Sequence, residues 1–177
     1  FDSEAQFYKH FDLPYIPPAM RETGSEVDVN MSEIITLDDI KGDIHMHTTY
    51  SDGAYSIREM VEACIERGYE YIVITDHSKS LPVANGLSEE RLLKQIEEIR
   101  KINDEYDEID VYAGTEMDIL SDGTLDYSDD ILKSLDYVIA SIHSNFNQTE
   151  EEIMHRLKCA MHNPYVRHIA HPTGRLI

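Results

Sequence analysis

From Lys41 onward, the apolar positions of the chain follow two alternating spacings. Short, nearly continuous apolar runs are typical of buried strands. Between these runs, apolar residues recur every three or four positions, which predicts amphipathic helices. Strands and helices that alternate in this way predict a parallel sheet with the helices outside it. The predicted strands cover residues 44–46, 71–75, 109–113, 137–141 and 166–170.

Polar residues mark where the predicted helices begin. Ser56 and Ser88 stand just before two helical patterns, where a side-chain oxygen can cap free N–H groups. Thr149 and Glu152 have the spacing of a capping box, and a short helix is expected over residues 128–134. The sequence therefore predicts an α/β fold with about five βα units. Because a closed parallel barrel has about seven or eight strands, we expect an open or incomplete barrel.

Residues 1–40 do not follow this rhythm. Pro14, Pro17 and Pro18 interrupt any helix there, and the aromatic and aliphatic side chains around them are suited to docking. The chain also begins without Met. We expect residues 1–40 to be a lead-in and linker from an upstream domain, and residues 41–177 to be a separate domain that is truncated at its C-terminal end.

The composition limits the partners of the chain. Its 15 Lys and Arg against 35 Asp and Glu give a net charge of −20, which opposes nonspecific binding of nucleic acid by this segment. No apolar run approaches the roughly 18 residues of a membrane span, so no membrane partner is expected. Cys64 and Cys159 fall on apolar helix faces, and buried free thiols suit a reducing, cytoplasmic location.

Residues that can bind metal ions stand at the end of every predicted strand. Two histidines separated by one residue on a strand share a face and lie about 6.5–7 Å apart. The carboxyl ends of parallel strands converge on one mouth of a barrel, so we expect these side chains to meet there. The candidate ligands are His45, His47, Asp52, His77, Glu116, His143 and His171.

This set of side chains indicates several transition-metal ions. Imidazoles combined with carboxylates suit Zn, Mn or Fe better than Ca, which prefers oxygen ligands. The candidates outnumber the ligands of one tetrahedral zinc, so two or three divalent ions are expected, with Glu116 bridging. Such ions activate water and neutralise phosphate oxygens during hydrolysis of phosphate esters. A single histidine at a strand end is more often a hydrogen-bonded core residue. We expect no ligand among His10, His155, His162 and His168.

Six short segments carry the candidate ligands. They are Asp43-Ile44-His45-Met46-His47, Ser51-Asp52-Gly53, Ile74-Thr75-Asp76-His77, Gly114-Thr115-Glu116, Ser141-Ile142-His143-Ser144 and Ala170-His171-Pro172. In this order they resemble the motifs of the PHP (polymerase and histidinol phosphatase) family, from about residue 40 to the end of the chain. The resemblance implies a distorted seven-stranded (βα) barrel with a trinuclear metal centre.

The resemblance also implies ligands for each ion. They are His45, His47 and Glu116 for the first ion, Glu116, His143 and His171 for the second, and Asp52 and His77 for the third. Asp76 would orient a ligand or a loop rather than bind an ion. A water activated by the ions would serve as the nucleophile, so no Ser or Cys nucleophile is needed.

Further segments are similar to the C-terminal PHP domain of bacterial family-X DNA polymerases. These segments are residues 13–18, 76–81 and 171–175. In those proteins a polymerase domain precedes the PHP domain in the same chain. The resemblance implies a metal-dependent 3′→5′ exonuclease or repair phosphodiesterase that acts on DNA 3′ ends within the full-length protein. Lys79 and Arg175 are candidates for binding substrate phosphate, with ordinary surface charge as the alternative.

One feature departs from the family pattern, and two other functions stay open. The family has a late Asp-x-His motif that does not occur up to Ile177. Without it, the first ion would lack an Asp and the third a His, and hydrolysis would be weak or absent.

A small-molecule phosphatase of the histidinol phosphatase type suits the acidic surface better. A non-catalytic, structural PHP domain is the third hypothesis, and the presence of the six central ligands argues against it.

Overall fold

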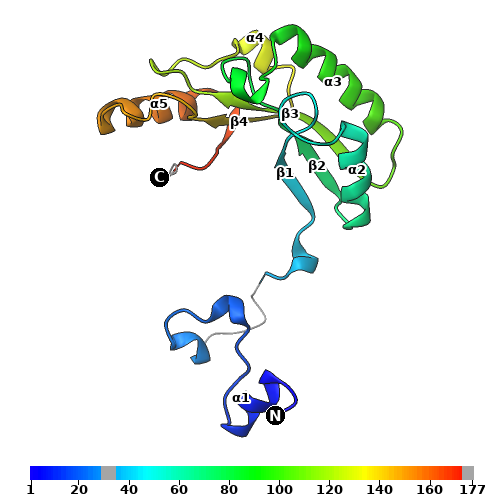
Figure 1. Cartoon of the computed structure of the whole chain (residues 1–177), viewed down its shortest axis with the longest axis vertical. Helices are drawn as coiled ribbons and strands as arrows, with labels where there is room; N and C mark the ends of the chain where they lie inside the picture. The colour runs from blue at the N-terminus through cyan, green and yellow to red at the C-terminus, as the bar shows by residue number, and fades with distance from the viewer. Residues whose placement is uncertain (29–34, 173–177) are drawn as a thin grey trace. The chain divides into compact units, whose positions relative to one another are not determined.

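The chain folds as two compact units. The computed structural model describes residues 1–28 and 35–172. The two units are Phe1–Ile40 and Lys41–Ile177, and Figure 1 labels their elements. Within the described residues, no helix is long and apolar enough to cross a bilayer. Lys41 is also where the alternation of strands and helices begins in the sequence.

In its described residues, the first unit contains one α-helix and several short 3-10 helices. Helix α1 (Glu4–His10) begins after Ser3, whose side chain accepts a hydrogen bond from the Gln6 N–H. The three prolines follow α1 rather than interrupt it. The other described elements are η1 (Pro18–Met20), η2 (Ser25–Asp28) and η4 (Leu37–Asp39). A role for this unit as a linker from an upstream domain stays a prediction.

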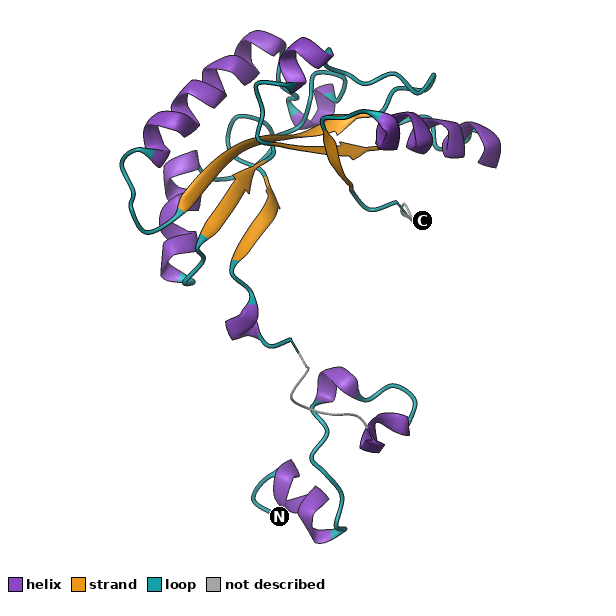
Figure 2. Ribbon diagram, turned by 180° about the vertical axis from the view of Figure 1, so that it is seen from behind, coloured by secondary structure: helices purple, strands orange, loops and turns teal. Residues whose placement is uncertain are grey.

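A five-stranded parallel sheet forms the frame of the second unit. Its strands are β1 (Gly42–Met46), β2 (Tyr71–Ile74), β3 (Asp110–Asp118), β4 (Tyr137–Ser141) and β5 (Val166–Ile169). They lie in the order β1-β2-β3-β4-β5, and every neighbouring pair is parallel. The sheet curls into a half-barrel, as Figure 2 shows. The prediction of an α/β fold with five parallel strands is confirmed.

Strand β3 joins the two halves of the curled sheet. Its residues 110–113 pair with β2, whereas residues 114–118 pair with β4. Gly114 stands where the pairing changes, and a Cβ there would lie 2.7 Å from both Tyr137 O and Val73 Cγ1. The predicted end of this strand at residue 113 was wrong. The prediction ended the strand where its apolar run stops, but pairing with β4 keeps residues 114–118 in the strand.

The helices begin at the predicted caps. The elements are α2 (Ile57–Glu66), η5 (Pro82–Ala84), α3 (Glu89–Asn103), α4 (Asp129–Leu132) and α5 (Glu150–His162). Ser56, Ser88 and Thr149 each accept a hydrogen bond from the backbone N–H three residues later. Caps of this kind stabilise a helix by about 1 kcal/mol. α2 and α3 lie on the convex side of the sheet (Figure 2).

The main core lies between the sheet and these helices. Ile72 and Ile74 of β2 are fully buried in one cluster with Val61 of α2 and Ile99 of α3. Each such side chain contributes about 1.5–3 kcal/mol when fully buried. This packing holds the strands in place, so that polar side chains at the carboxyl ends of the strands have fixed positions.

The two cysteines are free thiols in different surroundings. Cys64 is buried in the core cluster of α2. Cys159 is only partly buried, so the expectation of two buried thiols was wrong for this residue. The reason is that its side of α5 lies against the turn at Gly123 rather than against the sheet.

Candidate metal centre

The ends of all five strands meet around one carboxylate, that of Glu116. Glu116 lies on β3, and only 1% of its surface is exposed. The imidazoles around it are those of His45, His47, His77, His143 and His171. Each has a nitrogen 2.9–3.2 Å from a Glu116 oxygen. The structure therefore brings six of the candidate ligands to one place.

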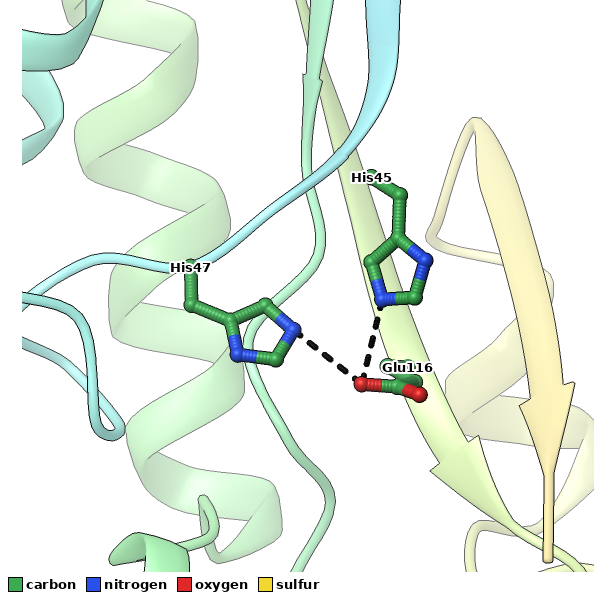
Figure 3. A group of neighbouring side chains, drawn as sticks. All are labelled: His45, His47 and Glu116. Atoms are coloured by element: carbon green, nitrogen blue, oxygen red, sulfur yellow. Dashed lines mark ion pairs between the residues drawn. The ribbon is translucent and has the colours of Figure 1, made fainter. Parts of the chain in front are cut away.

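One oxygen of Glu116, Oε2, faces the first two strands. It lies 3.1 Å from Nε2 of His45 and 3.1 Å from Nε2 of His47, as Figure 3 shows. His77, just after β2, brings its Nδ1 to 3.2 Å from the same oxygen. His45 lies on β1 and His47 follows its end, and because alternate residues of an extended segment share a face, both histidines point to this oxygen.

The other oxygen, Oε1, faces the last two strands. It lies 3.1 Å from His143 Nε2 and 2.9 Å from His171 Nε2. The Ser141 hydroxyl donates a hydrogen bond to it at 2.8 Å. A carboxylate whose two oxygens face separate groups of nitrogens has the arrangement of a bridging ligand.

Asp52 adds a second carboxylate at one side of the cluster. Its Oδ1 lies 2.9 Å from His47 Nδ1, and its Oδ2 lies 3.6 Å from His77 Nε2. Asp52 is half exposed, unlike Glu116, and it comes from the loop after β1. This carboxylate therefore shares two histidines with the Oε2 side of Glu116.

The donor atoms form three overlapping groups that fit metal ions. The groups are His45, His47 and Glu116; His77, Glu116 and His143; and His47, Asp52 and His77. Within each group the donor atoms lie within 4.8 Å of one another. His47 Nε2 and His77 Nδ1 are buried and, although they lie 3.1 and 3.2 Å from Glu116 Oε2, neither makes a hydrogen bond with it. Buried polar atoms without partners are costly, and a cation among them would satisfy these nitrogens.

Opposing charges set the protonation of the metal-free cluster. Burial would raise the pKa of Glu116, but the neighbouring imidazoles, led by His143 and His45, hold that pKa well below its usual range. Burial would lower the pKa of His143, but Asp118 and Glu116 outweigh it and raise the pKa to about 9. For His77 burial prevails, and its pKa is lowered. Ions entering the cluster must therefore displace protons, so their affinity should rise with pH.

Sequence analysis missed Asp118, which lies beside the cluster. Its carboxylate is buried, and both oxygens lie 3.3 Å from His143 Nδ1. The Ser78 hydroxyl donates a further hydrogen bond to it at 3.4 Å. A carboxylate on Nδ1 leaves Nε2 of His143 free to face Glu116. The spacing of Glu116 and Asp118 on one strand face could have indicated this residue had β3 been given its full length.

Asp76 lies behind the cluster and binds the loop after β1. Its Oδ1 accepts hydrogen bonds from the Thr48 N–H at 2.8 Å and the Ser51 N–H at 3.1 Å. The hydroxyls of both residues also donate to its carboxylate. Because Asp52 follows Ser51, this placement suits the expected role of Asp76 in orienting a loop.

The two expected phosphate-binding residues have different outcomes. Lys79 Nζ lies 2.8 Å from Glu89 Oε1 and 5.6 Å from the centre of the Tyr127 ring. Its charge is therefore already paired. Arg175 lies outside the described residues. Phosphate binding by either residue stays a prediction.

The remaining histidines lie on other parts of the chain. His10 ends α1, His155 and His162 lie on α5, and His168 lies on β5. None belongs to a group of possible metal ligands among residues 1–28 and 35–172.

Comparisons of the sequence identify a family and its relatives. The model of the PHP domain matches residues 43–171. The chain is 59% identical over its whole length to the DNA polymerase/3′-5′ exonuclease PolX of Bacillus subtilis strain 168, and spans 31% of that protein. It is also 35% identical to a probable phosphatase of Thermoanaerobacter sp. strain X514, over 73% of this chain and 53% of that protein. The resemblance to PHP domains and to family-X polymerases is confirmed.

A solved structure supports the fold. The histidinol phosphate phosphatase of Lactococcus lactis, solved in complex with zinc, L-histidinol and phosphate, superposes with a TM-score of 0.52. It is 22% identical, and the match covers 75% of this chain and 57% of that one. At this identity the similarity establishes a shared fold and leaves the activity to be argued from the site.

Proposed function

The chain belongs to the PHP domain family, and from this membership we propose that its second unit is a divalent-metal phosphoesterase acting on DNA 3′ ends. We further propose that it works within a full-length protein that carries a polymerase domain in the same chain. The 59% identity to a polymerase and 3′-5′ exonuclease over the whole chain favours this substrate. Phosphodiester hydrolysis is the reaction that the cluster around Glu116 is best equipped to perform.

The bridging position of Glu116 is the observation that carries the proposal. His45 and His47 would hold one ion with Oε2, whereas His143 and His171 would hold a second with Oε1. Asp52 and His77 would hold a third ion at the side. Imidazole with carboxylate favours zinc, manganese or iron among divalent ions. When bound, such ions would lower the pKa of water and neutralise phosphate oxygens.

The residues of the chain have two roles in this chemistry. Glu116, held by Ser141, supplies one buried negative charge that fixes the spacing between the two groups of histidines. In the neutral imidazole that would bind an ion, a carboxylate beside Nδ1 favours a proton on that nitrogen, so Asp118 would leave the Nε2 lone pair of His143 to point into the cluster. Both roles hold donor atoms in place before substrate arrives, which is how an active site avoids reorganisation during the reaction.

The negative charge of a phosphate substrate must be neutralised within a protein that is itself acidic. The chain has a net charge of −20, and the nearby Lys79 is already paired with Glu89. Phosphate binding would therefore depend on the ions, with Lys79 and Arg175 as further candidate contacts. Such dependence predicts that phosphate affinity is lost when the ions are removed with a chelator.

The test is release of nucleotides from a DNA primer. The full-length protein would be incubated with a 5′-labelled primer and Mn²⁺, and shortening from the 3′ end would be followed on a gel. Glu116→Gln should reduce the rate at least about 100-fold, because it removes the shared charge. His162→Ala, on the exposed part of α5, is the matched control and should keep the rate. A full-length protein with its metals in place that releases no nucleotide would refute the proposal.

A second candidate function is hydrolysis of a small phosphate monoester. The acidic charge favours it, since DNA is repelled, and a relative named as a probable phosphatase is 35% identical to the chain over 135 aligned residues. Histidinol phosphate is the substrate to compare, with release of inorganic phosphate as the readout. Faster turnover of histidinol phosphate than of primer ends would favour this alternative. A purified protein with almost no bound metal would favour the non-catalytic, structural role.

A further inference from the structure

Gln95 is a fully buried polar residue on α3, outside every motif of the metal centre. Its side-chain Nε2 donates a hydrogen bond to Asp76 Oδ2 at 2.5 Å. Its Oε1 is buried without a hydrogen-bond partner. A carbonyl buried in this way lowers stability, which an apolar side chain of similar length would avoid. The donor to Asp76 is therefore the contribution that explains an amide at this position.

Asp76 connects Gln95 to the loop after β1. It accepts four hydrogen bonds from that loop, two from Thr48 and two from Ser51, at 2.5–3.1 Å. The Gln95 donor comes from a different element, α3, and binds Oδ2 together with the Thr48 hydroxyl. A carboxylate bound by donors from two separate segments has little freedom to turn, so Gln95 helps to fix the Asp76 oxygens that hold the loop.

The same face of α3 holds the loop at a second point. Arg91 and Glu98 lie one helical turn on either side of Gln95. The Arg91 guanidinium donates to the Tyr50 carbonyl oxygen, and the Tyr50 hydroxyl donates to Glu98 at 2.6 Å. Arg91 and Glu98 therefore hold Tyr50 directly, whereas Gln95 holds Thr48 and Ser51 through Asp76.

The loop carries one donor of the metal cluster, the Asp52 carboxylate. Asp52 follows Ser51 and reaches His47 and His77 at 2.9 and 3.6 Å. We propose that Gln95 is a positioning residue that acts through Asp76 to hold Asp52 in place for the third ion. This inference rests on the proposed metal-dependent function. It applies to the group of His47, Asp52 and His77, because neither of the other two groups contains Asp52.

The test compares zinc binding by variants of the full-length protein. Gln95→Met keeps the length of the side chain and removes its donor. Zinc would be titrated by calorimetry, and anomalous scattering at the zinc edge would report the occupancy of each group. We expect the affinity for one ion to fall about 10- to 100-fold, with the loss confined to the Asp52 group. Leu92→Met, a buried replacement on the same helix, is the matched control and should bind zinc like the wild type.

Different results test the role of Gln95 and the proposed metal-dependent function. Asp52→Ala should lose the same ion. In a protein that already carries Asp76→Asn, adding Gln95→Met should have little further effect, because Gln95 acts on the loop through Asp76. Unchanged zinc occupancy in Gln95→Met, or an equal loss from all three groups, would overturn the inference. If Gln95→Met does not fold, Thr48→Val breaks the same route from the loop side, and the same results apply. Absence of zinc from the wild type would instead refute the proposed function.

Discussion

Replacement of Asp118 by Asn should change both the protonation and the metal affinity of His143. The wild-type carboxylate lies 3.3 Å from His143 Nδ1 and is buried. Together with Glu116 it raises the pKa of His143 to about 9, from an ordinary value of 6.5, although burial acts in the opposite direction. Asn keeps the shape of the side chain and removes its charge. We expect the pKa of His143 to fall by at least about one unit, which corresponds to about 1.4 kcal/mol.

The effect on metal binding should depend on pH. At pH 7, a metal-free wild-type His143 with a pKa of about 9 must lose a proton before it binds, which costs about 2.7 kcal/mol. The Asn variant avoids part of that cost but loses the carboxylate that orients the imidazole, worth about 10- to 100-fold in metal affinity. The variant should therefore lose more affinity at pH 9 than at pH 7.

Two measurements check this reasoning. NMR titration of the histidine ring protons in metal-free protein gives the pKa of His143, and zinc titrations at pH 7 and pH 9 give the affinities. Asp126→Asn is the matched control, since Asp126 is a buried carboxylate that binds Ser80 instead of a histidine. An unchanged pKa of His143 in Asp118→Asn would refute the assignment. So would an equal fall in the Asp126→Asn control.

Three further predictions concern stability. In metal-free protein, the raised pKa of His143 contributes stability that is complete below pH 6.5 and is lost as the pH rises towards 9. The lowered pKa of Glu116 contributes stability that is present above pH 4.5 and is lost at lower pH. Thermal melts should therefore show both contributions in full only between about pH 4.5 and 6.5, and saturating zinc should move the pH of maximum stability upward. Gly114→Ala should lower the free energy of unfolding by about 1–3 kcal/mol, because the new methyl meets Tyr137 O and Val73 Cγ1 at 2.7 Å; an unchanged urea midpoint would contradict this. Thr149→Ala should cost about 1 kcal/mol in the same assay, and restoration by Thr149→Ser would confirm that the cap is the cause.

The sequence by itself predicted the elements and the composition of the metal centre. Apolar spacing and capping residues are local signals, because helix and strand periodicities depend on neighbours a few residues apart. They located all five strands and the starts at Ser56, Ser88 and Thr149. Because the carboxyl ends of parallel strands converge, the strand positions alone predict that the histidines and Glu116 lie together.

Only the tertiary structure decided how these side chains meet. Which Glu116 oxygen faces which histidine depends on the curl of the sheet, and hence on pairing between residues far apart in the chain. The same pairing extended β3 to Asp118 and so placed that carboxylate on His143. Gln95 belongs to no motif, and its contact with Asp76 exists only because α3 packs against β3, the strand next to β2. Local spacing gives the kind of residue at each strand end, but donor geometry within an ångström is set by long-range packing.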